Sequence, residues 1–379
     1  MIYFDNAATT YPKPADVISS VVECMQDYCG NPGRGSHFFA KSSAEKVFMA
    51  REAVGEFFNA SPENVIFTLN TTYALNMAIK GVMHSGGHML ISNMEHNSVL
   101  RPVSQLSRAK KISYNIFDGY GKDGSLTSKE ILSDILSKLR RDTKMLVCIH
   151  SSNICSHTMP IREIGQLCRR HGILFCVDAA QSAGILPINM EEDCIDLLCL
   201  PGHKGLLAPQ GIGILVLRQG LTLDTLIEGG NGINSLAQDM GRESPERYEG
   251  GTICTPAAVG LYAGLQFIQN YGLHTISRHH CFLWKEAASL LNSSPRIIIH
   301  DHTPGSVLLF SIDGLQADEV GRMLDRRGFC LRTGYHCAAL AHRTLNTPVG
   351  GAVRIGFGIF NTEAQTEALC QAIIDIAKQ

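Results

Sequence analysis

Residues 173–181 read ILFCVDAAQ, an apolar run that ends in the acid Asp178. Its first five residues are mostly β-branched or aromatic, which is typical of a strand buried on both faces. Six similar runs occur elsewhere, at residues 64–68, 88–92, 111–117, 144–150, 195–200 and 213–217. Amphipathic helical patterns separate several of them, as at residues 72–84 and 161–171. This alternation predicts an α/β fold with a mostly parallel sheet that is covered on both sides.

The C-terminal third of the chain has a different pattern. Residues 228–255 are rich in Gly, Asn and Ser and are predicted to form a loop or crossover. Helical patterns follow at residues 256–270, 273–291 and 362–378, with strand patterns at 306–312 and 352–356. We therefore expect a second, smaller α+β domain after the loop.

Composition excludes several classes of function. The 379 residues allow a large domain with a smaller partner, and the formal net charge of -2 implies no bulk attraction to nucleic acid or an anionic membrane. We expect no signal peptide, because the first residues show no basic region followed by an apolar one, and no membrane helix, because no apolar stretch is long enough. We also expect no metal site, because neither Cys-x-x-Cys nor His-Glu-x-x-His occurs. The 13 scattered cysteines predict free thiols and a cytoplasmic protein.

Two charged residues at predicted strand ends indicate a cofactor. Asp178 follows one strand, and Lys204 follows the next strand pattern within PGHKG (residues 201–205). Each has an ordinary alternative, as a turn-forming acid or a surface lysine. Together they fit pyridoxal 5'-phosphate (PLP), which needs a lysine for its Schiff base and an acid to keep its pyridine nitrogen protonated.

Other residues could serve the same cofactor. Thr71 and Thr72 lie between a strand and a helical pattern, where backbone N–H groups and hydroxyls favour a phosphate. An ordinary helix N-cap would use the same residue types. His96 follows the strand at 88–92 and could stack on a flat ring, or it could be a solvated loop histidine.

Cys337 ends the stretch RTGYHC, residues 332–337. The neighbouring Arg332 and His336 could favour its reactive thiolate, whereas the ordinary alternative is a buried apolar cysteine. Arg354 lies in an apolar strand pattern and therefore needs an anion nearby. A substrate carboxylate or an internal salt bridge would supply that anion.

The chain resembles the class V, fold-type I PLP-dependent enzymes, and among them the cysteine desulfurases and selenocysteine lyases. The resembling motifs span residues 3–362 and are YFDNAATT (3–10), RGSH (34–37), EHNSV (95–99), SN (152–153), VDAAQ (177–181), GHK (202–204), GT (251–252), RTGYHC (332–337), Arg354 and FNT (360–362). The resemblance implies an aspartate aminotransferase-like fold. It would have a large PLP-binding domain, residues 15–255, and a small domain made of residues 1–14 and 256–379.

The resemblance also implies a role for each cofactor contact. Lys204 would form the Schiff base with PLP and move the Cα proton, while Asp178 would pair with the pyridine nitrogen and His96 would stack on the ring. Thr252 would reach the phosphate bound by the other subunit of a homodimer. The remaining contacts would come from Gln181 and Asn153 near the ring hydroxyl or substrate carboxylate, and from Thr71, Thr72 and His203 at the phosphate.

On the substrate side, the resemblance implies that Arg354 and Arg332 bind the carboxylate of L-cysteine. Cys337 would take the substrate sulfur as a persulfide, L-alanine would leave, and a reductant or a sulfur-acceptor protein would remove the sulfur. The expected activity is that of a cysteine desulfurase.

Two departures from the family pattern leave alternatives open. Pro201 stands where relatives often carry Ser or Thr, and because it has neither hydroxyl nor N–H we expect one phosphate contact to be missing. Residues 338–343 also differ from the best-known members of the short-loop subgroup. Alternatives are a selenocysteine lyase, a class V aminotransferase or carbon–sulfur lyase, and, outside enzymes, a catalytically silent PLP-fold scaffold.

Overall fold

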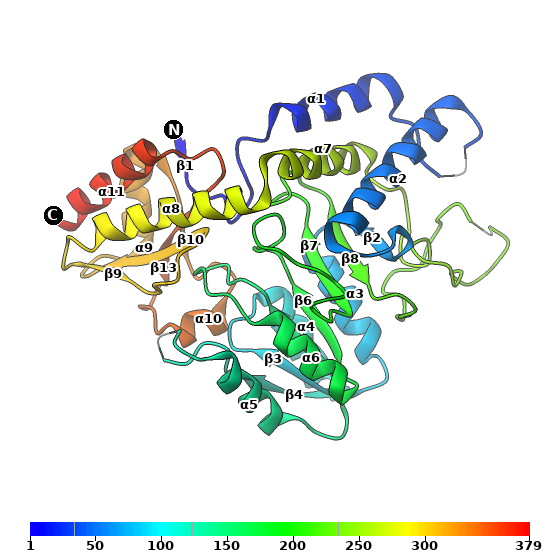
Figure 1. The fold of residues 1–379 in the computed structure, drawn as a ribbon, viewed down its shortest axis with the longest axis horizontal. Helices are drawn as coiled ribbons and strands as arrows, with labels where there is room; N and C mark the ends of the chain where they lie inside the picture. The colour runs from blue at the N-terminus through cyan, green and yellow to red at the C-terminus, as the bar shows by residue number, and fades with distance from the viewer. Residues whose placement is uncertain (34, 123, 234) are drawn as a thin grey trace.

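The computed structural model describes residues 1–33, 35–122, 124–233 and 235–379 (Figure 1). Arg34, in the motif at 34–37, lies outside the described residues. The larger sheet has the strand order β2-β8-β7-β6-β5-β3-β4. Its strands are β2 (Val65–Thr68), β3 (Gly87–Ser92), β4 (Ile112–Phe117), β5 (Thr143–Ile149), β6 (Leu174–Asp178), β7 (Leu197–Pro201) and β8 (Gly213–Leu217). The strands are parallel, except that β8 runs antiparallel to both of its neighbours. The predicted strands and the mostly parallel sheet are confirmed.

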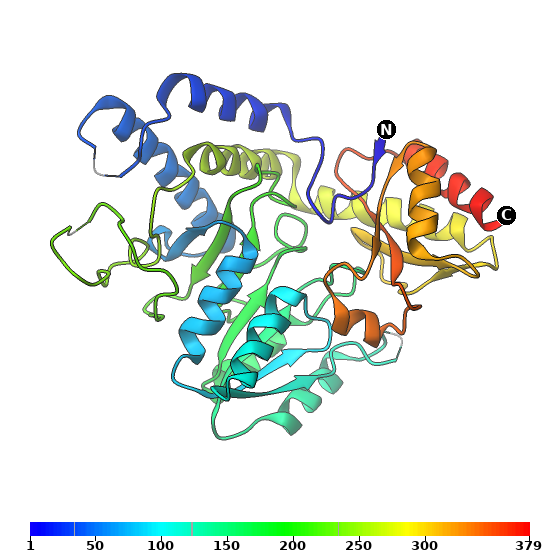
Figure 2. The ribbon, with the colours of Figure 1, turned by 180° about the vertical axis from the view of Figure 1, so that it is seen from behind.

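Helices cover both faces of this sheet, and successive strand residues point to opposite faces. In β6, Phe175 and Val177 join the core on one side, whereas Cys176 joins the core on the other. The first face is covered by α2 (Phe38–Phe58), α5 (Ser128–Lys138), α6 (Ile161–His171) and α7 (Thr255–Tyr271), and the second by α3 (Thr71–Met83) and α4 (Asn97–Arg108). Figures 1 and 2 show the two faces in turn. Burial on both sides explains why the strand is apolar throughout.

The second sheet is antiparallel, with the order β12-β13-β10-β9. Its strands are β9 (Ile297–Ile299), β10 (Val307–Ile312), β12 (Arg332–Gly334) and β13 (Ala352–Gly356). A separate apolar core joins this sheet to α8 (Leu273–Leu291), α9 (Ala317–Arg326) and α11 (Glu363–Ala377), and the short helix α10 (Ala339–Thr344) lies between β12 and β13. The α+β character predicted for this region is confirmed.

The N-terminal residues lie beside the C-terminal ones. Strand β1 (Ile2–Tyr3) pairs in parallel with β11 (Phe329–Cys330), and Phe4 is buried in the smaller core. Farther along, α1 (Ala15–Glu23), continued by a π-helical turn η1 (Cys24–Tyr28), packs against α7. Helix α7 begins at Thr255 and buries apolar residues in the larger core, so the division at 255/256 stays a prediction.

Two connecting stretches complete the chain. A 3-10 turn η2 (Pro62–Asn64) leads into β2, and the described residues between β8 and α7 form neither helix nor strand, as expected for the Gly-rich loop. In the described parts of the chain, no helix has both the length and the apolar character needed to cross a membrane.

Candidate active site

A cavity lies at the carboxyl ends of the central strands. Ligands of open α/β sheets bind at this edge. Asp178 ends β6, Ile149 ends β5, and Lys204 lies just beyond β7. The full lining is Asn70, Thr71, Thr72, His96, Ser98, Ile149, Asn153, Asp178, Ala180, Gln181, His203 and Lys204. The structure therefore brings together eight of the residues singled out from the sequence, contributed by the ends of five strands of the sheet and the connections that follow them.

Lys204 has the electrostatic environment of a reactive amine. Loss of water around the side chain lowers its pKa to about 8, and the charge of Asp178 partly opposes that shift. A substantial fraction of the amine is therefore neutral near pH 7–8. The surface-lysine alternative is wrong, because Lys204 is only partly exposed and lines the cavity.

Asp178 is buried, and one of its carboxylate oxygens, Oδ1, accepts a hydrogen bond of 2.9 Å from the backbone N–H of Ala180. Burial raises the pKa of Asp178 to about 6, against the opposing effects of the Ala180 bond and of Lys204. The carboxylate is thus ionised for the most part at neutral pH and would favour a cation placed beside it.

The N-terminus of α3 forms another wall. The Asn70 side chain caps this helix by accepting from the Tyr73 N–H, so the N-cap interpretation is correct for Asn70. Thr71 and Thr72 make no capping bond with any described residue, and the Thr72 hydroxyl instead lies 2.8 Å from the Ser98 hydroxyl. The N–H groups at this helix end, together with the neighbouring hydroxyls, suit an anion.

His96 is the N-cap residue of α4 and is not a solvated loop histidine. Its ring nitrogen Nδ1 accepts from the Ser98 N–H at 3.1 Å and lies 2.9 Å from the Ser98 hydroxyl. Burial, then the positive charges of Lys204 and Arg354, lower the pKa of His96 to about 4. The ring is therefore neutral at pH 7, with its proton on Nε2.

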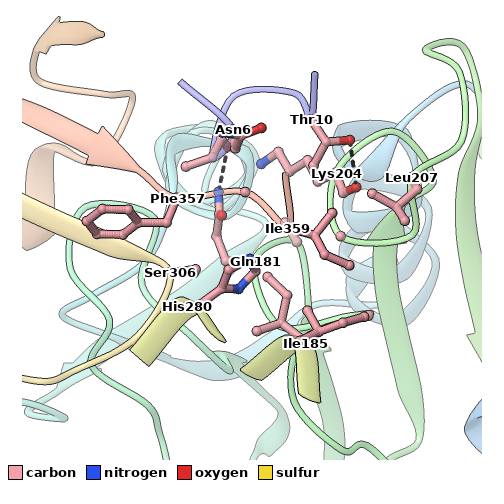
Figure 3. A pocket seen from close by; sticks show the side chains of 16 residues that line it. Asn6, Thr10, Gln181, Ile185, Lys204, Leu207, His280, Ser306, Phe357 and Ile359 are labelled. Atoms are coloured by element: carbon pink, nitrogen blue, oxygen red, sulfur yellow. Dashed lines mark hydrogen bonds between the residues drawn. The ribbon is translucent and has the colours of Figure 1, made fainter. Parts of the chain in front are cut away.

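Gln181 and Lys204 form part of a wall shared with a second pocket, shown in Figure 3. The Gln181 amide donates to the backbone oxygen of Ala7 at 2.9 Å, and the Thr10 hydroxyl bonds the backbone oxygen of Lys204 at 3.1 Å. His203, next to Lys204, places Nδ1 3.0 Å from the Thr9 hydroxyl. The N-terminal segment thus supports the site from behind.

Cys337 lies exposed on the loop between β12 and α10. The backbone oxygen of Cys337 accepts from the Asn97 N–H at 2.7 Å, and that of His336 accepts from the Asn153 side chain at 2.9 Å. The loop is therefore bonded to segments that also line the cavity. The buried-cysteine alternative is wrong for Cys337.

His336 does not act as the positive neighbour expected for the thiol. Its ring is buried and bonds the Arg332 carbonyl and His342, and burial is the largest of the effects that lower its pKa to about 3. The ring is neutral at physiological pH, so His336 supplies no charge to a Cys337 thiolate. Only Arg332 remains of the two expected cations.

Arg354 is buried in β13, directly across the ladder from Arg332 of β12. Its Nη2 pairs with Asp5 Oδ1 at 2.8 Å, and its Nη1 donates to the Asn153 carbonyl at 2.9 Å. The internal salt bridge considered from the sequence is thus present. The buried Nε of Arg354 nevertheless has no hydrogen-bond partner among the described residues, which leaves a donor for a further anion.

Thr252 does not line this cavity. It lies on the long loop before α7 and borders two other depressions, and Asn31 contacts its hydroxyl at 3.4 Å. The contact predicted for Thr252 reaches another subunit, which a single chain does not contain, so it stays a prediction.

Sequence reasoning gave no role to two residues that support the site. Glu95 is fully buried, and its Oε1 accepts from the Ser92 hydroxyl at 2.5 Å and from the Ile149 N–H at 2.8 Å. Lys13 donates to the His203 carbonyl at 2.8 Å. The sequence shows only that Glu95 directly precedes His96 and that Lys13 lies shortly after the motif at residues 3–10. Neither observation is distinctive alone.

The chain is similar to known proteins over nearly its whole length. Residues 2–369 match the family model for aminotransferase class-V. The chain is 30% identical to a probable cysteine desulfurase of Pyrococcus abyssi, over 100% of this chain and 94% of the relative. It is 28% identical to a probable cysteine desulfurase of Methanothermobacter thermautotrophicus, over 99% of this chain and 94% of that relative. The apo structure of a cysteine desulfurase from Thermococcus onnurineus NA1 has a TM-score of 0.91 and 30% identity, covering 100% of this chain and 94% of that one.

The chain therefore belongs to the aminotransferase class-V family, whose fold the two sheets and their helices reproduce. Within it, the chain is a member of the cysteine desulfurase group, a group of PLP-dependent enzymes. The family and the fold predicted from the motifs are both confirmed.

Proposed function

We propose that this enzyme converts L-cysteine to L-alanine and keeps the sulfur on Cys337. The observation that carries the proposal is the joining of the Cys337 loop to the cavity that holds Lys204 and Asp178, through Asn153 and Asn97. A plain aminotransferase has no use for a thiol in that place.

The residues present fit PLP. Lys204 supplies an amine of lowered pKa for covalent attachment, Asp178 a buried carboxylate for the pyridine nitrogen, and the α3 N-terminus a place for the phosphate. The buried Oδ1 of Asn153, which has no partner among the described residues, is a free acceptor in the cavity wall. When bound, PLP would supply an electron sink for negative charge at the substrate Cα.

Other side chains that line the cavity would contact the cofactor directly. The neutral ring of His96 can stack on an aromatic ring without charge repulsion from Lys204. The hydroxyls of Thr71 and Thr72, with His203, would add hydrogen bonds to the phosphate, and Gln181 would bond the ring hydroxyl.

Arg354 would bind the substrate carboxylate through its unpartnered Nε, with Arg332 adding positive charge from the neighbouring strand. Asp5 and the Asn153 carbonyl hold the guanidinium in place beforehand, so little conformational entropy would be lost on binding.

The chain's own groups carry the proton and the sulfur. The Lys204 amine takes the Cα proton and later returns a proton to the product. The Cys337 thiolate attacks the substrate sulfur, so a sulfur–sulfur bond forms while the substrate carbon–sulfur bond breaks. The balance is L-cysteine plus enzyme thiol giving L-alanine plus enzyme persulfide, and it needs no external oxidant.

A homodimer, a sulfur-acceptor protein and a cytoplasmic setting complete the proposal. Large apolar side chains exposed on α1, η1 and α2 support a second copy packing on this side of the molecule, namely Ile18, Val22, Met25, Phe38, Phe39 and Phe48. Thr252 lies on a neighbouring loop and would serve the partner's phosphate. The exposed Cys337 leaves the sulfur accessible to an acceptor, and thirteen free thiols fit a reducing compartment.

Assays of PLP-loaded enzyme with L-cysteine and with L-selenocysteine, measuring alanine together with sulfide or selenide, test the proposal. We expect wild type to release alanine from cysteine, and Cys337→Ser to lose this activity while keeping the visible absorbance of the lysine-bound cofactor. Undiminished desulfuration by Cys337→Ser would overturn the role of the thiol. Activity on selenocysteine alone, kept in Cys337→Ser, would identify a selenocysteine lyase instead.

A further inference from the structure

The loop that presents Cys337 has an unfavourable backbone conformation. His336 and Cys337 have positive φ angles of 49° and 56° in succession. Residues with a Cβ seldom occupy this left-handed region, and two in a row persist only where surrounding contacts fix them. The contacts around these two residues therefore decide where the Cys337 thiol lies.

Among the described residues, three hydrogen bonds hold the backbone of this turn. Asn153 and Asn97 donate to the His336 and Cys337 carbonyls, and the Ala338 N–H donates to the Tyr335 carbonyl at 2.9 Å. All three act on the main chain. The side chain of His336 makes further hydrogen bonds that can hold the same two residues in place.

The His336 ring belongs to a chain of hydrogen bonds whose direction is fixed. Its Nε2 lies 3.2 Å from the Arg332 carbonyl, which can only accept, so Nε2 carries the proton. The bare Nδ1 then accepts from His342 Nε2 at 3.2 Å. His342 Nδ1 is bare in turn and accepts the Thr347 hydroxyl at 2.8 Å. The two rings are nearly parallel, with an interplanar angle of 10°.

This chain of hydrogen bonds requires a neutral His336, since a proton on His336 Nδ1 would face the N–H of His342. The surroundings favour that state. Burial first, then Arg354, the other ring and Arg332, lower the pKa of His336 to about 3. Burial first, then His300 and Arg354, lower the pKa of His342 to about 4. All the hydrogen bonds of this chain are thus present at pH values around 7.

We propose that His342 is a positioning residue for Cys337, acting through His336 in the one-directional chain Thr347–His342–His336–Arg332. The inference rests on the proposed function, which assigns sulfur transfer to Cys337. His342 touches neither the thiol nor the cavity. It fixes the tautomer and the orientation of His336, and so the left-handed turn that places the thiol.

His342→Phe keeps a flat ring but removes both hydrogen bonds of that ring. We expect kcat for alanine formation from cysteine to fall roughly tenfold, because a buried acceptor on His336 loses its donor and the turn relaxes. KM for cysteine should stay unchanged, since the Arg354 site is untouched. His342→Gln, whose amide can donate to His336, should recover much of the loss.

Hydrogen–deuterium exchange gives a readout independent of turnover. Amides of the peptide covering residues 335–345 should exchange faster in His342→Phe than in wild type, and close to the wild-type rate in His342→Gln. Thr344→Val is the matched control. It removes a hydroxyl of α10 that bonds the Asn93 and Leu340 carbonyls and takes no part in the hydrogen bonds between Thr347, His342, His336 and Arg332. Its exchange pattern and kcat should match wild type.

The outcomes separate this inference from the proposed function. If Cys337→Ser is inactive but His342→Phe has wild-type kcat and exchange, the positioning role is wrong and the proposed function stands. If Cys337→Ser remains active, the proposed function fails first, while faster exchange in His342→Phe would still establish the contact chain. Should His342→Phe not fold, Thr347→Val decides, with a smaller fall in kcat expected and an unchanged kcat overturning the proposal.

Discussion

The guanidinium of Arg354 is ion-paired with the carboxylate of Asp5 across 349 positions of sequence, at 2.8 Å. Arg354 is almost fully buried, and Asp5 is about one-fifth exposed. The pair neutralises a charge that would otherwise be isolated in the protein interior. It also sets the direction in which the remaining N–H groups of Arg354 point.

Breaking this pair should destabilise the protein. Asp5→Asn leaves the Arg354 charge without its counterion, and we expect the free energy of unfolding to fall by about 2 kcal/mol, below the range for a fully buried pair because Asp5 is partly exposed. Urea denaturation of the cofactor-free protein measures this. Asp375→Asn, which breaks an exposed pair with Lys378, should change stability by under about 0.5 kcal/mol. Equal losses of stability in the two variants would show that burial does not determine how much the Asp5–Arg354 pair stabilises the protein.

Arg354→Lys tests the carboxylate site. Lysine lacks the planar fork and cannot keep both present bonds while also offering a donor to substrate, so KM for cysteine should rise about tenfold or more. Steady-state kinetics over a range of cysteine concentrations give KM and kcat separately. Arg343→Lys, on the exposed side of α10, is the control and should leave KM unaltered. An unchanged KM in Arg354→Lys would assign the carboxylate to another residue.

Lys204→Ala should abolish the visible absorbance of the lysine-bound cofactor and all turnover, since no other amine in the cavity can replace the Schiff base. A spectrum recorded after incubation with PLP and gel filtration measures this. Lys285→Ala, which removes an exposed lysine from α8, should keep the full band. Persistence of the band in Lys204→Ala would place the attachment elsewhere.

Glu95 should make stability depend on pH. Burial, opposed by the Ser92 hydrogen bond, raises the pKa of Glu95 from 4.5 to about 8 in the folded protein. The folded state then binds the proton more tightly than the unfolded one, so stability is lost as pH rises between these two values, by up to about 1.4 kcal/mol per pH unit. Glu95→Gln lacks this titration.

Denaturation of wild type and Glu95→Gln at several pH values between 5 and 8 checks the sign. At pH 5 the variant should be the less stable, because its amide N–H₂ replaces a buried oxygen that has no partner. The difference should shrink or reverse towards pH 8. Parallel stability curves for the two proteins would mean that Glu95 does not titrate as its burial indicates.

The central sheet could be predicted from the sequence because its strands are apolar throughout and separated by helices of clear 3.6-residue period. Helix α2 was not predicted. It carries exposed apolar side chains, including Phe38, Phe39 and Phe48, which blur the distinction between its buried and its solvent-facing sides. Strand β1 was also missed, since its two residues acquire strand character only by pairing with β11.

Some of the site residues could likewise be predicted from the sequence, and others could not. Lys204 and Asp178 could be predicted, because each follows a recognisable strand and their chemistry is complementary. The two interpretations of Arg354 could not be separated, since the partner that decides between them lies at the opposite end of the chain. His336 was assigned the wrong charge, because the sequence shows a neighbour of Cys337 but not the burial that removes its proton.

The N-terminal segment that backs Lys204 has a consequence for biosynthesis. Residues 2–10 emerge from the ribosome long before residues 329–330, 356 and 361, with which β1, Asp5 and Asn6 pair. Contacts so far apart in sequence close late and slowly. The large sheet can form while translation continues, but the pairings of β1, Asp5 and Asn6 that hold this segment in place cannot form until residue 361 has been made.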